Sequence, residues 1–222
     1  MRTLFLGTGS YVPYTITNRE LFQIYHKKID GHRPCDRQGA PLKSDWLDRY
    51  FGIQSRCLDL THGGMRDTDF AVTAAEVALE NSGVCASSIR FIVHVSPTPD
   101  QIHFQSHMAQ IIQKLRLATD VHALYLDLGC AALGPALREV QANLLLEPDT
   151  HALLICSQCV SPFVKEENYL PYYLTHTDPF AWLQAGAVFS DGGAAVVCKL
   201  VEDQEKRGIL RTWTGCDPKG VI

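Results

Sequence analysis

Short apolar runs alternate with helical stretches along most of this chain, and this alternation constrains the fold more than any other feature of the sequence. The apolar runs are rich in Val, Ile, Leu and Phe, which is typical of buried strands. The runs that we expect to be strands are 2–7, 90–96, 122–128, 151–157 and 194–201. Strands that alternate with helices predict an α/β fold, in which helices cover a layered mixed sheet.

Three stretches carry the helical pattern. Residues 67–82 are rich in Ala, and Gly83 follows where a left-handed C-terminal cap is expected. Residues 104–117 place an apolar stripe on one face, and the stretch after residue 130 repeats leucine and valine at helical spacing. We therefore expect a helix in each of these places.

The composition is that of an ordinary globular protein: among 222 residues, 46% are hydrophobic and 20% are charged. The net charge of −4 gives no reason to expect nucleic-acid binding, and no apolar run reaches the ~18 residues of a membrane span. The apolar stretch before Gly7 is too short for the core of a secretory signal, which predicts a cytoplasmic location. Eight cysteines in such a chain are expected to be free thiols.

Cys130 lies at the seam between an expected strand and an expected helix, in "LYLDLGCAALGPALREV". One interpretation is a small buried hydrophobe that fills a tight corner. The other is a nucleophile, because the first N–H groups of a helix have no intrahelical partner and stabilise a thiolate. Pro135 leaves the start of the helix open between Ala131 and Pro135 itself. The local pattern alone leaves both interpretations open.

Several familiar motifs fail on inspection. "GTGSYV" has Val12 where a dinucleotide-binding fingerprint has its third glycine, and "SDGGAA" lacks the Lys-Ser/Thr of a P-loop. "CSQC" at 156–159 has no second Cys pair to complete a zinc site, and in a strand its two thiols point to opposite faces. We therefore expect no metal site, dehydrogenase or NTPase.

Two long connections interrupt the alternation. Residues 26–45 are polar and basic and have no periodicity, whereas residues 161–185 hold six aromatic side chains. Connections of this length inside a compact domain are usually functional. The alternatives are a solvated surface insertion for the first and a loop folded on its own aromatic cluster for the second.

Five segments, taken together, resemble the ketoacyl-ACP synthase III family of thiolase-fold condensing enzymes. They are "GTGSYVP" (7–13), "SDWLDRYFGIQSR" (44–56), "FQSHMAQIIQKL" (104–115), "GCAALG" (129–134) and "FSDGGAAVV" (189–197). The resemblance covers nearly the whole chain and implies a thiolase-like domain over 1–222, with insertions at about 26–45 and 161–185. It corresponds to the N-terminal half of an αβαβα arrangement, without the C-terminal half.

The resemblance implies roles for five residues. Cys130 is expected to accept an acyl group, with its backbone N–H in an oxyanion hole. The expected substrate-binding residues are Trp46, Arg49, Phe104 and Phe189. The family's catalytic His and Asn come from the second half of its fold, which implies a longer enzyme or a separate chain that carries them. His103, His107 and His176 are the alternatives within this chain.

The expected function is a Cys-dependent acyltransferase or β-ketoacyl synthase III-like enzyme of specialised polyketide or fatty-acid-derived metabolism. Its acyl donor is coenzyme A (CoA) or the phosphopantetheine of an acyl carrier protein (ACP), as substrate and with no cofactor. Trp46 matches the adenine-stacking residue of CoA-using members, but Tyr50 and Leu183 stand where the family has arginines, which favours a carrier protein. We also expect a homodimer, with Phe104 at the subunit boundary. The alternatives are a non-catalytic half of a heteromeric ketosynthase and a thioester hydrolase.

Overall fold

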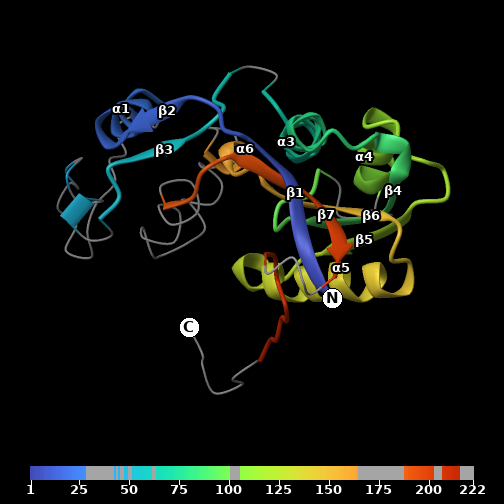
Figure 1. Ribbon diagram of the computed structural model, residues 1–222. Coiled ribbons are helices and arrows are strands. Elements are labelled where there is room, and N and C mark those ends of the chain that lie inside the picture. The colour runs from blue at the N-terminus through green and yellow to red at the C-terminus, as the bar shows by residue number, and fades with distance from the viewer. Residues whose placement is uncertain are drawn as a thin grey trace. The chain divides into compact units, whose positions relative to one another are not determined.

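The chain divides into two compact units in the computed structural model (Figure 1), which describes residues 1–28, 43, 45, 48–49, 52–61, 64–100, 106–164, 188–202 and 207–215. The first unit comprises Met1–Tyr11, Arg66–Gln158 and Gly193–Ile222. The second comprises Val12–Met65 and Cys159–Gly192. Both predicted insertions fall in the second unit, and most of their residues lie outside the described ranges.

A five-stranded mixed sheet forms the centre of the first unit. Its order is β1 (Arg2–Tyr11), β7 (Gly192–Val201), β6 (His151–Gln158), β4 (Ile89–Val95) and β5 (His122–Leu126). β1 runs antiparallel to β7, whereas β4 runs parallel to both β5 and β6. All five predicted strands are present, so the α/β class and the mixed sheet are confirmed.

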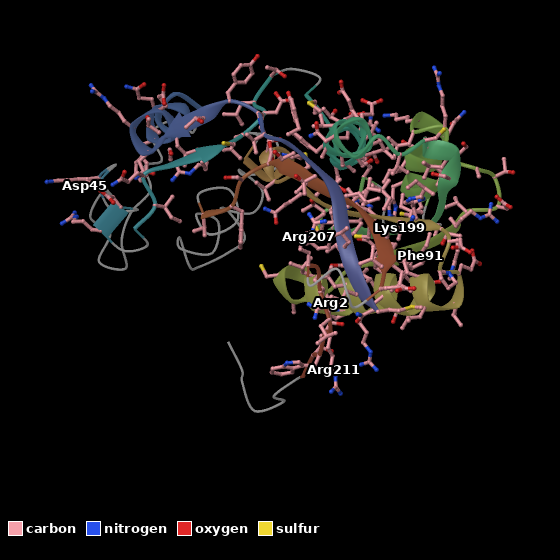
Figure 2. All side chains as sticks on the ribbon, in the orientation of Figure 1. Arg2, Asp45, Phe91, Lys199, Arg207 and Arg211 are labelled. Atoms are coloured by element: carbon pink, nitrogen blue, oxygen red, sulfur yellow. The ribbon has the colours of Figure 1, made fainter. Side chains whose placement is uncertain are left out.

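Helices cover both faces of this sheet, as Figure 1 shows. Helices α3 (Asp67–Ser82) and α4 (Ser106–Lys114) pack on one face, and α5 (Leu133–Leu146) packs on the other. Ala74, Ile92 and Ile111 are fully buried in the core beneath α3 and α4. Phe91, labelled in Figure 2, belongs to the core beneath α5.

Residues with left-handed φ values lie just beyond the C-terminal ends of α3 and α4. α3 has the predicted bounds and ends at Gly83, whose φ of 66° is left-handed, as expected of a C-terminal cap. α4 is shorter than the predicted 104–117, because Arg116 adopts a left-handed φ of 54° just beyond it. Residues 104 and 105 lie outside the described ranges.

Two glycines of β1 let the strand run close beneath α3. A Cβ on Gly7 would stand 2.4 Å from the Ser82 nitrogen, and one on Gly9 would stand 2.2 Å from the Ala74 oxygen. Because a side chain would clash with the helix backbone at both positions, "GTGSY" serves helix–strand packing. The strand continues to Tyr11, beyond the predicted 2–7, with a register shift between Phe5 and Gly7.

The second unit contains a two-stranded antiparallel sheet, formed by β2 (Thr15–Thr17) and β3 (Ser55–Cys57), with α1 (Asn18–Lys28) and α6 (Ser161–Val164). Asp191 is almost fully buried there, and its carboxylate accepts hydrogen bonds from the backbone N–H groups of Asp59, Val160 and Ser161. Asp191 therefore ties together chain segments that are far apart in sequence. Within the described ranges, no helix is both long and apolar enough to span a bilayer.

Candidate active site

Cys130 lies in a single 3₁₀ turn, η2 (Gly129–Ala132), which connects the end of β5 to the start of α5. Gly129 opens this turn with a φ of 54°, a left-handed conformation that glycine adopts without strain. Apart from its immediate neighbours in the chain, no described residue has an atom within 4 Å of the point where a Cβ on Gly129 would stand, so conformation and not crowding calls for glycine here. The predicted place of Cys130, next to a helix N-terminus, is confirmed.

Helix α5 begins at Leu133, between the two starting points that the sequence left open. Pro135 is therefore its third residue. The first N–H groups of a helix have no intrahelical acceptor, so a residue without an N–H is tolerated in this turn. The 3₁₀ turn that carries Cys130 thus leads directly into α5.

The Cys130 side chain is exposed, and two exposed leucines, Leu128 and Leu133, flank its turn. The six cysteines that the structure describes are all free thiols, and of these only Cys85 is also exposed. Burial raises the pKa of Cys156, and it raises the pKa of Cys198 to about 12. The Cys130 thiol is therefore accessible from solvent, and the interpretation of a buried corner residue is wrong.

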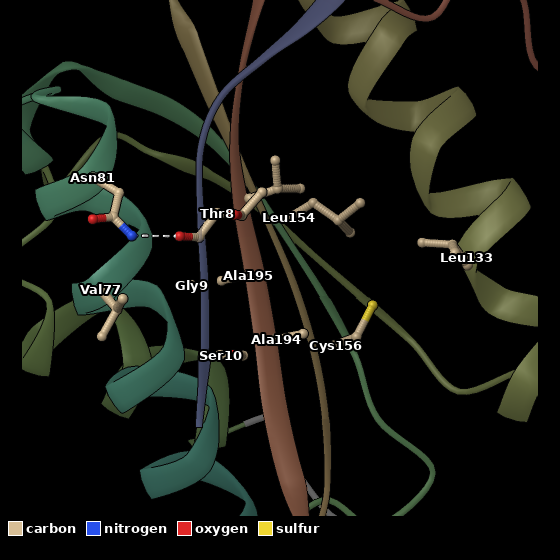
Figure 3. A pocket seen from close by; sticks show the side chains of 11 residues that line it. Thr8, Gly9, Ser10, Val77, Asn81, Leu133, Leu154, Cys156, Ala194 and Ala195 are labelled. Carbon is tan, nitrogen blue, oxygen red and sulfur yellow. Dashed lines mark hydrogen bonds between the residues drawn. The ribbon is translucent and has the colours of Figure 1, made fainter. Parts of the chain in front are cut away.

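A groove with a volume of about 580 Å³ is lined by strand residues, by Val77 and Asn81 of α3 and by Leu133 of α5. The strand residues belong to β1, β7 and β6 and include Thr8, Ser10, Leu154, Cys156 and Ala194. Figure 3 shows Leu133 across from Leu154 and Cys156. Leu133, which lines this groove, follows Cys130 by three residues.

Arg49 and Phe189, two of the predicted substrate-binding residues, are exposed and belong to the second unit. The Arg49 guanidinium forms an ion pair of 3.3 Å with Asp45, one helical turn earlier, and the Asp45 side chain points into solvent in Figure 2. Phe189 precedes Ser190, whose hydroxyl accepts a hydrogen bond from the Cys57 backbone. Their roles stay predictions. Trp46 and Phe104 lie outside the described residues.

The structure also contains a buried polar cluster that the sequence did not reveal. His94 of β4 is fully buried, and Asp67 of α3 and His107 of α4 are each 1% exposed. Such burial prevents His107, one of the candidate catalytic histidines, from reaching a substrate. His103 and His176, the other two, lie outside the described residues. Among the described residues, no group of three or more His, Cys, Asp or Glu side chains is placed to hold a metal ion.

Comparisons with known proteins find relatives that are named beta-ketoacyl-(acyl-carrier-protein) synthase III. It is 30% identical over 208 residues to beta-ketoacyl-(acyl-carrier-protein) synthase III of Laribacter hongkongensis, covering 93% of this chain and 54% of that protein. It is 28% identical over 228 residues to the protein of the same name from Hyphomonas neptunium, covering 100% of this chain and 55% of that protein. The chain therefore spans about half the length of these relatives. No family model matches it.

Solved structures agree on the fold. The 3-oxoacyl-(acyl-carrier-protein) synthase III of Aquifex aeolicus matches with a TM-score of 0.65 and 23% identity, over 90% of this chain and 55% of that one. A variant of OleA from Xanthomonas campestris in complex with cerulenin matches with a TM-score of 0.72 and 19% identity, over 92% of this chain and 59% of that one. The thiolase-like fold expected from the sequence is confirmed.

Proposed function

Because this chain is a homologue of the beta-ketoacyl-(acyl-carrier-protein) synthase III proteins over nearly its whole length, we propose that it supplies the acyl-accepting cysteine of a condensing enzyme. The Cys130 thiolate attacks the carbonyl carbon of an acyl thioester. The donor leaves as a thiolate, which takes up a proton to become the free thiol, and the acyl group stays on Sγ as a new thioester. A second substrate then accepts the acyl group from Cys130.

The observation that carries this proposal is the place of Cys130 in the fold. Its thiol is exposed, in a turn that a positive-φ glycine opens, immediately before a helix of 14 residues. Backbone N–H groups at the start of such a helix are partly positive and unpaired. They are suited to stabilise the thiolate and the negative charge that develops on the carbonyl oxygen in the transition state.

The acyl donor belongs to the same proposal. CoA or an ACP presents its acyl group on phosphopantetheine, so either is a substrate and no further cofactor is required. The basic segment 26–45 favours an acidic carrier protein, because opposite charges speed an encounter between two proteins. The aromatic residues of 161–185 favour an acyl pocket suited to specialised polyketide or fatty-acid-derived metabolism. We place this chemistry in the cytoplasm.

The proposal also includes a second half of the active site, which carries the catalytic His and Asn. Two observations support it: the chain spans about half the length of its relatives, and an open groove is lined by residues of α3, α5 and the sheet. Leu145 and Leu146 at the end of α5 are 54% and 81% exposed. Exposed apolar surface is typical of a face that another part of the protein covers.

A homodimer is consistent with the open edge of the sheet. In the order of the described strands, β5 stands at one end, and its residues His122 and Ala123 are exposed. An edge strand presents unpaired N–H and C=O groups, to which a second copy can pair about a twofold axis. The predicted boundary role of Phe104 stays part of this proposal.

The proposal is tested by incubating the full chain, with any partner chain that copurifies, with an acyl-N-acetylcysteamine thioester. We expect intact mass spectrometry to show one added acyl group and peptide mapping to place it on Cys130. Cys130→Ala should abolish the adduct, and Cys130→Ser should weaken it strongly because a hydroxyl is scarcely ionised near neutral pH.

Cys85→Ala is the matched control, since Cys85 is the other exposed thiol among the described cysteines. This variant should be acylated like the unaltered chain. An acyl group found on Cys85, or one that persists in Cys130→Ala, would contradict the proposal.

A further inference from the structure

The buried polar cluster lies where three parallel strands end. His94 is the penultimate residue of β4 and stands in register with Tyr125 of β5 and Ile155 of β6. Asp67 begins α3, and Ser157 lies near the end of β6. Ionisable groups are rarely enclosed in this way unless they are paired, because burial strongly disfavours their charged forms.

The contacts of His94 differ from those of a catalytic triad. Its Nε2 atom lies 2.7 Å from the Ser157 hydroxyl and 3.5 Å from Oδ2 of Asp67. Serine and carboxylate therefore share one ring nitrogen, whereas a triad places them on opposite nitrogens. Within the described part of the chain, Nδ1 of His94 has no hydrogen-bond partner. The cluster is also sealed from solvent, so a substrate cannot reach it.

Below about pH 7, burial keeps both members of the Asp67–His94 pair neutral. It raises the pKa of Asp67 to about 7, against the opposing effect of the Ser157 and Ser96 hydroxyls. Burial and, to a smaller extent, the nearby His107 lower the pKa of His94 to about 3. At slightly acidic pH the pair therefore holds one proton and no net charge. Loss of that proton near neutral pH leaves a buried carboxylate with no compensating charge on His94.

Other ionisable groups face the pair from the elements packed around it, and none of those that the structure describes offsets this charge. Asp100, in the connection after β4, raises the pKa of Asp67. From α4, His107 is kept neutral because burial lowers its pKa. From β5, the pKa of Tyr125 is raised to about 12 by burial and by Asp127. Tyr125 and His107 are therefore both neutral near pH 7.

A short path of contacts leads from the pair to the turn of Cys130. The Tyr125 ring packs against His107, with ring centres 4.5 Å apart, and against His94, with ring centres 5.8 Å apart. The Tyr125 hydroxyl donates to the Ser96 carbonyl over 2.6 Å, and the Ser96 N–H donates to the Leu126 carbonyl over 3.3 Å. Leu126 is the last residue of β5, four residues before Cys130. These contacts connect the buried cluster to the C-terminal end of β5, and the turn that carries Cys130 follows that end.

We propose that Asp67 and His94 form a buried proton switch that positions Cys130. With its proton bound, the pair holds the ends of β4, β5 and β6 together. Without the proton, the buried carboxylate disturbs the contacts of Ser96 and Tyr125, and the turn after β5 loosens. Asp67 acts through these neighbours and is a positioning residue. The switch rests on the proposed role of Cys130 for its effect on catalysis, but not for its existence.

The proton count explains how the fold tolerates such a pair. In the unfolded chain, Asp titrates near ~3.9 and His near ~6.5. Between these values the unfolded pair holds one proton on His, and the folded pair holds one proton on Asp67, so folding takes up none and its stability does not change with pH. From about pH 6.5 to 7 only the folded pair keeps its proton, and stability falls slightly as pH rises. Below about pH 4 the unfolded pair gains a second proton, and stability falls as pH falls.

Carbon-13 NMR of the full chain tests the switch directly. We expect the Asp67 carboxyl to titrate with a midpoint near pH 7, and the Leu126 and Gly129 amide signals to shift with the same midpoint. In Asp67→Asn, which is neutral at every pH, these amide shifts should disappear. If that variant does not fold, the carboxyl titration of the unaltered chain still decides. An Asp67 midpoint near ~4, typical of an ordinary aspartate, would overturn the proposal.

Asp69→Asn is the matched control, because Asp69 lies in the same first turn of α3 and loses the same charge. Burial acts to raise the pKa of Asp69, but the Lys114 ammonium and the Arg66 backbone lower it overall. The amide titration at Leu126 should therefore persist in Asp69→Asn, and its loss there would overturn the proposal. The pH profile of Cys130 acylation should lose its inflection near pH 7 only in Asp67→Asn. Complete absence of acylation would refute the proposed function and leave the NMR result to decide on the switch.

Discussion

Cys85, which caps a 3₁₀ turn, and Cys130, which lies within one, are both exposed thiols, yet their surroundings differ in a way that separates a reactive cysteine from a candidate active site. Cys85 caps η1 (Ala86–Ser88), which leads at once into β4. Its thiol lies 3.0 Å from the Ser87 hydroxyl, and the Ser87 side chain and backbone lower its pKa. Cys85 is therefore the thiol with the clearer local stabilisation of a thiolate.

Cys130 has features that a binding site needs and Cys85 lacks. Its turn leads into α5, which has 14 residues with aligned peptide dipoles. The 3₁₀ turn that Cys85 caps has only three residues, so its summed dipole is much weaker. It follows the end of a strand in a parallel pair, and the wall of a groove of about 580 Å³ begins three residues later. In open α/β sheets, ligands bind beyond the carboxyl ends of parallel strands. Position in the fold, more than thiolate stabilisation, thus marks Cys130.

The largest expected effect is a reversal of preference between two reagents. A small alkylating agent such as iodoacetamide responds mainly to the thiolate fraction, so we expect it to modify Cys85 readily near neutral pH. An acyl thioester also needs donors for its oxyanion, each worth roughly a hundredfold in rate or more. Cys130 should therefore be favoured over Cys85 by at least about a hundredfold with the thioester.

The measurement is the rate at each cysteine, obtained by peptide mapping of the same protein sample with each reagent. Unfolding the chain in urea should remove the preference of the thioester for Cys130, because both thiols then meet the same solvent. Equal thioester rates at Cys85 and Cys130 in the folded protein would mean that the fold gives Cys130 no advantage.

The sequence was sufficient for the parts of this comparison that depend on local pattern. Apolar runs predicted all five strands of the sheet, and Ala-rich helical spacing with Gly83 predicted α3 and its cap. The seam at Cys130 was visible because the strand pattern stops and the helical pattern begins there. These features can be predicted without the tertiary structure, because they depend on residues that are close together in the sequence.

The rest depends on contacts between residues far apart in sequence. His94 lies inside an apolar strand, and the sequence alone indicates only a core position. The strand register places it beside Tyr125, and the fold brings the Asp67 carboxylate to 3.5 Å from its Nε2 atom. The close approach of β1 to α3, which explains Gly7 and Gly9, is likewise a tertiary contact. Periodicity reports which face of an element is buried, but not which residue it will meet there.

An intermediate effect is expected from the glycines that precede the two thiols. Gly83 and Gly129 have left-handed φ values of 66° and 54°, and no atom lies within 4 Å of either Cβ position. Alanine at either site should lower the free energy of unfolding by about 1 kcal/mol, through backbone strain alone. Only Gly129→Ala should also slow acylation of Cys130, by about tenfold, because small displacements of a reacting group are costly.

Urea unfolding and the acylation rate of each variant check this pair. The comparison is matched, since the two substitutions introduce the same methyl group in the same backbone conformation. If Gly83→Ala slowed acylation as much as Gly129→Ala, general loosening of the fold would explain the result and the turn would have no special role.

The smallest effect concerns Ser87. Ser87→Ala removes the hydroxyl next to the Cys85 sulfur but keeps the backbone N–H that also stabilises the thiolate. The pKa of Cys85 should therefore rise only part of the way to its ordinary value, and alkylation of Cys85 near neutral pH should slow by a few-fold. The pH dependence of the alkylation rate measures this shift.

Ser88→Ala is the control, because the Ser88 hydroxyl donates to the Cys85 carbonyl and not to its thiol. Acylation of Cys130 should be the same in both variants, because Cys85 does not take part in that reaction. A change in Cys130 acylation in Ser87→Ala alone would show that the two turns are coupled.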